Sequence, residues 1–197
     1  MTRQLHIGLS LTPTWLKSRA ADDPDPLPAR DPVAFNLALT RMAEQAKLDF
    51  VFKPDYLLLH PGAAASGFVG LDPTLLLTAL ACQTDRIGLV TTVSTSFNPP
   101  FVVARQIQSL HWISRGRVGL NIVTSIEGAE NFGEEPMPPP EVRYRKAAEF
   151  TDVIRKLWRS YPHEALTGTT PSAAIEHRGE FFSVKGPLNV PVSASCG

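Results

Sequence analysis

A chain of 197 residues is long enough for one domain with a sizeable core. Basic and acidic residues balance at 19 each and no block of like charge stands out, which excludes nucleic acid and an anionic membrane as expected partners. The N-terminus lacks the apolar run of a signal peptide, and the densest apolar run, 75–82, is too short to span a bilayer. We therefore expect a soluble, cytoplasmic protein with no membrane partner.

The first part of the chain alternates strand and helix patterns. Apolar residues at every second position predict a strand over 5–9. Asp31 is a helix N-cap with Pro32 at the first helical position, and an apolar helical stripe follows them. Residues 50–53 form the next apolar strand pattern.

The same order repeats further along the chain. Asp72 and Pro73 start a helix predicted over 74–84, in which Cys82 is expected to be a small core residue. The remaining predicted elements are a strand over 86–95, a helix that starts after the prolines of 98–114, a strand over 116–125 and a helix over 143–161. From Pro162 the pattern changes to short pieces typical of a hairpin or an extended excursion.

Four successive strand and helix units predict an α/β fold with a parallel sheet and right-handed crossovers. Both a doubly wound sheet and a β/α barrel are built this way. A doubly wound nucleotide-binding fold places a glycine-rich phosphate turn after its first strand. Residues 9–15, LSLTPTW, contain no such turn, so the barrel is favoured.

In a β/α barrel the active site gathers at the carboxyl ends of the strands. The predicted strand ends carry small polar side chains and a single acid: Ser10, Thr12, Asp55, Tyr56, Thr91, Thr92, Ser94, Thr95, Asn121, Thr124 and Ser125. This set lacks the histidine and carboxylate cluster of a metal site, and no GxSxG motif or Cys/His pair indicates covalent catalysis. Neutral donors and acceptors suit a planar polar ligand, and a flavin, a sugar or a nucleoside fits that description.

Several of these residues also have a purely structural alternative. Asp55 can cap the turn after Pro54, and Thr92 and Ser94 can be ordinary strand formers. Asn121 is polar within an apolar strand, where burial without a partner costs about 1–3 kcal/mol, so we expect it to face a ligand.

Ordered motifs make a family resemblance specific. The run at 81–125, ACQTDRIGLVTTVSTSFNPPFVVARQIQSLHWISRGRVGLNIVTS, is followed by ENFG at 130–133 and RYRKAAEFTDVIRKLW at 143–158. With HRGEFFSVKGPLNVP at 177–191, these motifs resemble nitrilotriacetate monooxygenase component A and dibenzothiophene-sulfone monooxygenase. Those enzymes are a branch of the bacterial luciferase-like flavin-dependent monooxygenases.

The resemblance implies a single incomplete luciferase-like domain over 1–197, comprising the first four to five β/α units of a (β/α)8 TIM barrel, with 162–197 as the excursion. It also implies FMN, supplied in reduced form by a separate, transiently bound flavin reductase, and the oxidation of a small organic substrate with O2. By position, the resemblance places five residues at the cofactor: Asp55, Thr92, Ser94, Asn121 and Tyr144. Tyr144 matches a tyrosine that reaches the flavin phosphate, although it can equally belong to a helix start whose arginines are solvated. No catalytic residue and no metal ligand is implied.

The sequence departs from the family pattern in three places. Leu120 stands where the family has tryptophan, and Pro140 lies near the place of a histidine that faces the flavin in relatives. The third departure is the largest, because relatives are about twice as long and a complete β/α barrel needs about 250 residues. The closing residues, SASCG, also fit the family poorly.

Three alternatives to an active FMN enzyme therefore stay open. The chain could be a truncated, inactive remnant, or one piece of a split barrel. A deazaflavin could also replace FMN, as in some luciferase-like relatives. Because four or five units leave two strand edges unpaired, association into a homo-oligomer is also expected.

Overall fold

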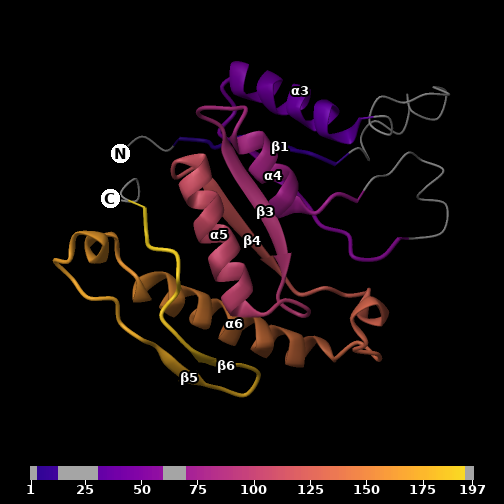
Figure 1. The fold of residues 1–197 in the computed structure, drawn as a ribbon. Helices are drawn as coiled ribbons and strands as arrows, with labels where there is room; N and C mark the ends of the chain where they lie inside the picture. Colours follow the sequence, from indigo (N-terminus) through magenta and orange to yellow (C-terminus); the bar gives the residue numbers. More distant parts are fainter. Residues whose placement is uncertain (1–3, 13–30, 60–69, 194–197) are drawn as a thin grey trace. The chain divides into compact units, whose positions relative to one another are not determined.

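The computed structural model describes residues 4–12, 31–59 and 70–193. Four strands form one sheet, in the order β1-β2-β3-β4, and β5 and β6 form a second sheet. Figure 1 labels both strands of the second sheet. The chain divides into two compact units, Met1–Thr92 with Arg117–Gly119 and Val93–Gly116 with Leu120–Gly197. Strands β3 and β4 contribute residues to both units. The closing residues that fit the family poorly lie almost entirely outside the described residues.

In the first unit, strands and helices alternate as the sequence predicts. Strand β1 (Gly8–Ser10) pairs in parallel with β2 (Phe50–Lys53), which pairs in parallel with β3 (Gly88–Ser94). The connecting helices are α3 (Pro32–Gln45) and α4 (Pro73–Ala81). The predicted α/β class with parallel strands is confirmed.

Aspartate side chains fix the starts of both helices in this unit. Asp31 Oδ1 accepts a hydrogen bond of 2.8 Å from the backbone N–H of Ala34, and Asp72 Oδ1 accepts one of 2.8 Å from Leu75. Each aspartate thereby satisfies one of the free N–H groups that every helix start exposes. Both predicted N-caps are confirmed.

The core of this unit lies between β2, β3 and α4. Val51, Leu77 and Leu89 have no exposed surface. The Thr91 hydroxyl lies 2.9 Å from the Thr74 hydroxyl on α4, so Thr91 points toward that helix. Because side chains alternate along a strand, Thr92 points to the opposite face of the sheet.

Glycine is required at position 8, where β1 runs against a ring on β2. A Cβ atom on Gly8 would lie 2.1 Å from Cε2 of Phe50. We expect Gly8→Ala to lower the free energy of unfolding by about 1–3 kcal/mol, since the ring or the strand must move, as urea denaturation can measure. Combining it with Phe50→Leu should recover part of the loss, and an unchanged unfolding midpoint for Gly8→Ala alone would contradict the expectation.

In the second unit, α5 (Pro100–Ser114) and α6 (Pro140–Ser160) enclose an apolar core. Leu110, Phe150 and Leu157 are at most 1% exposed. The indole Nε1 of Trp158 on α6 donates to the carbonyl of Ala104 on α5 over 3.1 Å. The unit also contains the end of β4 (Val118–Val123) and two short 3-10 helices, η3 (Ala129–Phe132) and η4 (His163–Thr167).

The chain after α6 forms the predicted hairpin. Strand β5 (Glu176–Arg178) pairs antiparallel with β6 (Ser183–Lys185). The chain before the hairpin and the chain after it both bond to Ser160, the last residue of α6. Its carbonyl accepts from the N–H of Ala173 at 2.8 Å, and its hydroxyl accepts from the N–H of Leu188 at 2.9 Å.

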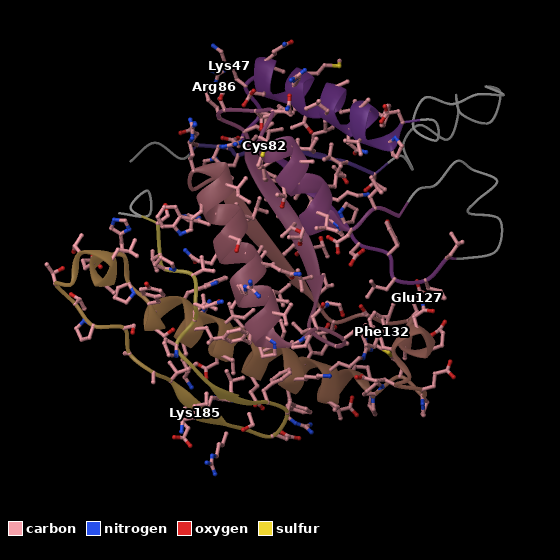
Figure 2. All side chains as sticks on the ribbon, viewed as in Figure 1. Lys47, Cys82, Arg86, Glu127, Phe132 and Lys185 are labelled. Atoms are coloured by element: carbon pink, nitrogen blue, oxygen red, sulfur yellow. The ribbon has the colours of Figure 1, made fainter. Side chains whose placement is uncertain are left out.

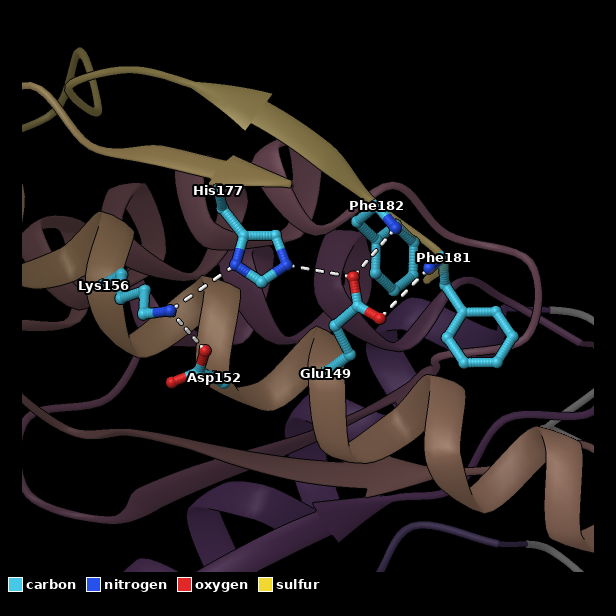
Figure 3. Close-up of polar contacts among 6 residues, drawn as sticks. All are labelled: Glu149, Asp152, Lys156, His177, Phe181 and Phe182. Carbon is cyan, nitrogen blue, oxygen red and sulfur yellow. Dashed lines mark hydrogen bonds and ion pairs between the residues drawn. The ribbon is translucent and has the colours of Figure 1, made fainter. Parts of the chain in front are cut away.

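One carboxylate fastens the hairpin to α6. Glu149 accepts hydrogen bonds from the backbone N–H groups of Phe181, at 3.0 Å, and Phe182, at 2.9 Å. Its Oε1 also lies 2.9 Å from Nε2 of His177 on β5 (Figure 3). The Glu149 and His177 side chains are only 14% and 12% exposed. The hairpin is therefore held by a shielded charge at its turn as well as by its ends.

Two details of the sequence interpretation are corrected. Cys82, labelled in Figure 2, is exposed because α4 ends at Ala81 and Cys82 forms the C-cap beyond it. Helix α6 begins at Pro140, three residues before the predicted start, since proline is well suited to the first helical position.

Candidate functional site

In the second unit, a buried serine at the end of β3 is bonded to a half-buried serine just beyond β4. Ser94, the last residue of β3, is 1% exposed, and its Oγ accepts a hydrogen bond of 2.7 Å from the Ser125 hydroxyl. The same oxygen accepts from the backbone N–H of Ser96 at 3.3 Å. The backbone N–H of Thr95 donates to the carbonyl of Val123 at 2.9 Å. The predicted polar strand end at Ser94 is thus joined to the residues that follow β4.

Two cations on α6 bind the carbonyls of these strand ends. Arg143 Nη1 donates to the carbonyl oxygens of Thr124, at 3.3 Å, and Ser125. One turn later, Lys146 Nζ donates to the carbonyl oxygen of Ser96 at 2.6 Å. Arg143 is half-buried, whereas Arg145 is exposed and pairs with the surface residue Glu180. The structural alternative for Tyr144 expected both arginines to be solvated, and this holds for Arg145 alone.

Two buried polar atoms in this region lack a partner within the described part of the chain. They are Ser96 Oγ and Arg143 Nε. Ser96 is only 4% exposed. A buried donor without a partner costs about 1–3 kcal/mol, and such atoms are few in native proteins. The strand ends therefore carry a local cost that packing alone does not require.

The loop beyond these strand ends is held by an aromatic stack. The rings of Phe97 and Phe132 are parallel within 1° with centroids 4.3 Å apart. The loop surrounds an open hollow of about 400 Å³, lined by 127–130 and 135–137. Figure 2 labels Glu127 and Phe132 on this loop.

Asn121 and Tyr144 belong to the same unit and differ in their exposure. Asn121 lies in β4 and is half-buried, at the spacing of two residues from Gly119 that places both on one face of the strand. Tyr144, near the start of α6, is 67% exposed. Its phenol is therefore open to a ligand from solution.

Asp55 and Thr92 belong to the first unit. Thr92 is 4% exposed, and Asp55 is half-buried just beyond β2. Burial raises the pKa of Asp55 and the nearby Asp72 carboxylate raises it further, while the Tyr56 N–H and the Lys53 ammonium act in the opposite direction. The Asp55 carboxyl group therefore holds its proton to a higher pH than an ordinary aspartate does.

Sequence reasoning missed a buried lysine beside this aspartate. Lys53, the last residue of β2, is 4% exposed, and its Nζ donates to the carbonyl of Leu11 at 3.4 Å. Burial lowers the pKa of Lys53, against the attraction of Asp55, which raises it. A charged residue in register with the buried Val51 is the signal that could have revealed it.

Within the described ranges, no group of three or more His, Cys, Asp or Glu side chains could hold a metal ion. No helix in the same ranges combines the length and the apolar character needed to cross a membrane.

Parallel strands linked by helices, with polar residues at their carboxyl ends, have the arrangement of a β/α barrel segment. Residues 13–195 match the model of the luciferase-like monooxygenase family, and the chain belongs to that family.

Among its relatives, the chain is 39% identical to nitrilotriacetate monooxygenase component A from Aminobacter aminovorans, over 81% of this chain and 40% of that protein. It superimposes on EDTA monooxygenase from Chelativorans sp. BNC1 with a TM-score of 0.83 at 28% identity, covering 98% of this chain and 49% of that one. It is also similar to riboflavin lyase, solved with modified FMN and riboflavin, with a TM-score of 0.80 at 28% identity over 97% and 48% of the two chains. The chain thus spans less than half the length of these proteins.

Proposed function

We propose that this chain supplies the FMN-binding strand ends of a monooxygenase that oxidises a small organic compound with reduced flavin and O2. The observation that carries the proposal is the Ser94–Ser125 hydroxyl pair, with the Ser96 amide also bonded to Ser94, at strand ends of the kind where a β/α barrel keeps its active site. Family membership and the likeness to riboflavin lyase, which was solved with modified FMN, support it.

The residues present fit such a group chemically. An isoalloxazine edge has both donors and acceptors, and hydroxyl and amide side chains offer both in return. Ser94 and Asn121 are side chains of this kind, and the exposed phenol of Tyr144 can donate to a phosphate oxygen. Asp55 and Thr92 remain predicted contacts, supported by the sequence resemblance.

Bound in reduced form, FMN would supply the electrons that activate O2, while the protein binds, orients and shields it. Ser94 and Ser125 would hold the ring edge. Burial raises the pKa of Asp55, so its carboxyl group keeps a proton to a higher pH than an ordinary aspartate does. We propose a flavin reductase as the transient partner that delivers reduced FMN. The cytoplasmic location of the protein remains a prediction.

The proposal is tested by titrating the purified chain with FMN and following the quenching of flavin fluorescence. Ser94→Ala removes the hydroxyl that Ser125 and the Ser96 amide share, so we expect an affinity loss of about tenfold. Ser109→Ala is the matched control, because among the described residues that hydroxyl bonds to its own helix alone, at the Arg105 carbonyl. This variant should bind FMN as the wild type does.

Two results would reject the proposal. One is a wild-type chain that leaves FMN fluorescence unchanged at millimolar concentration, which favours the inactive remnant or a split barrel. The other is an equal affinity of the wild type and Ser94→Ala. A parallel titration with a deazaflavin decides the remaining alternative, since tighter binding of the deazaflavin would reject FMN as the cofactor.

A further inference from the structure

We infer that Arg143 is a positioning residue that sets the end of β4, and through it the Ser94–Ser125 hydroxyl pair, for a bound flavin. The assignment of the flavin rests on the proposed function. The positioning itself rests on contacts within the second unit alone.

One guanidinium group binds two consecutive backbone carbonyls just beyond β4. Arg143 Nη1 donates to the carbonyl oxygens of Thr124 and Ser125. These residues follow the last residue of β4, so they lie where the regular hydrogen bonding of the strand has ended. Hydrogen bonds from a charged donor are stronger than neutral ones, and the planar guanidinium resists rotation away from both oxygens.

Ser125 connects the Arg143 contact to the candidate site. The Ser125 carbonyl is bound by Arg143, and the hydroxyl of the same residue donates to Ser94 over 2.7 Å. A shift of the Ser125 backbone would therefore turn its hydroxyl away from Ser94. The position of the hydroxyl pair depends on a side chain from a helix that is distant in sequence.

Lys146 binds the backbone beyond the end of β3 in the same way. It lies one turn after Arg143 on α6 and donates to the Ser96 carbonyl at 2.6 Å. One helix thus places a cation on the backbone beyond β4 and another on the backbone beyond β3. Hydrogen bonds from both cations converge on the segments that carry the three serines.

The unpartnered atoms argue that this arrangement serves more than stability. Arg143 Nε and Ser96 Oγ are buried without a partner among the described residues, which lowers stability. A neutral or apolar residue at position 143 would avoid the first cost. Local costs of this kind gather at functional sites.

The test compares Arg143→Gln and Arg143→Lys with the matched control Arg155→Gln, an exposed arginine on the same helix. The affinities for FMN and for riboflavin are measured by fluorescence quenching. Amide hydrogen exchange of 124–126 is measured without flavin. For Arg143→Gln we expect both affinities to fall by the same factor, about tenfold, and the exchange of 124–126 to accelerate. Arg143→Lys should restore part of each, and Arg155→Gln should change neither.

The outcomes distinguish a positioning role of Arg143 from a direct contact with the flavin phosphate and from no role in flavin binding. A loss confined to FMN would mean that Arg143 contacts the phosphate directly, which overturns the inference, as do unchanged affinities. If the wild type binds neither flavin, the proposed function fails, and unchanged exchange at 124–126 in Arg143→Gln then overturns the positioning as well. If Arg143→Gln does not fold, Arg143→Lys is judged by the same criteria.

Discussion

Arg117→Met is expected to lower the free energy of unfolding by about 3 kcal/mol, because it removes a charged donor that serves several backbone carbonyls at once. The guanidinium donates to the carbonyls of Ala81, Thr84 and Ile87 at 2.9–3.0 Å, and to the Thr84 hydroxyl at 3.1 Å. Ala81 is the last residue of α4, where a helix leaves carbonyls without internal partners. Arg117 closes that helix end against the starts of β3 and β4.

Equilibrium unfolding in urea measures this effect, with Arg86→Met as the control in the same unit. Arg86 is exposed and lies close in sequence to the carbonyls that Arg117 binds, so its loss should change stability by no more than about 0.5 kcal/mol. Arg117→Lys should lie between the two, because an ammonium cannot reach all four acceptors in one plane. If Arg117→Met and Arg86→Met unfold at the same urea concentration, the argument is wrong.

The second large effect is expected at the carboxylate that fastens the hairpin. Glu149→Gln should cost about 2 kcal/mol, since an amide nitrogen would face a backbone N–H where an oxygen now accepts. Glu141→Gln is the control, as that exposed glutamate lies on the same helix. Amide exchange at Phe181 and Phe182 should accelerate in Glu149→Gln and stay unchanged in Glu141→Gln.

The same carboxylate gives a defined pH dependence. Burial opposes ionisation of Glu149, but the hydrogen bonds from His177 and from the Phe182 and Phe181 amides outweigh it, so the pKa is lowered. A lowered pKa in the folded state stabilises the protein above the unfolded value, about 4.3, and this stabilisation is lost as the pH falls through the folded value. The wild type should therefore lose stability on acidification more steeply than Glu149→Gln. Parallel curves of the two proteins below pH 5 would refute this.

The order of elements could be predicted from sequence because local signals determine it. Asp31 with Pro32, and Asp72 with Pro73, are caps that act within one helical turn, and both helices begin there. The strand over 50–53 was predicted with its observed bounds, since proline follows it directly. Cys82 was placed in the core wrongly because the end of α4 has no comparable local signal.

The contacts at the candidate site could not be predicted in the same way, because they join residues far apart in the chain. Ser94 and Ser125 were both predicted as polar strand-end residues, but the hydrogen bond between their hydroxyls was not. Nothing near Arg143 indicates that its side chain binds the backbone at Ser125. Lys53 differs from these contacts, because its position two residues after the buried Val51 could have revealed its burial.

Ser160 allows the length of the chain after α6 to change without disturbing the helix. Because its carbonyl and hydroxyl hold residues Ala173 and Leu188 at one point, the intervening chain leaves the helix and returns to it within a single residue's reach. The loop from Ser160 to Ala173 is closed by the same residue, and the entropy of closing a loop grows only slowly with its length. Residues inserted among the exposed 170–172 would therefore leave α6 and the Glu149 contacts at the hairpin turn undisturbed. This exposed stretch is the natural place for a graft.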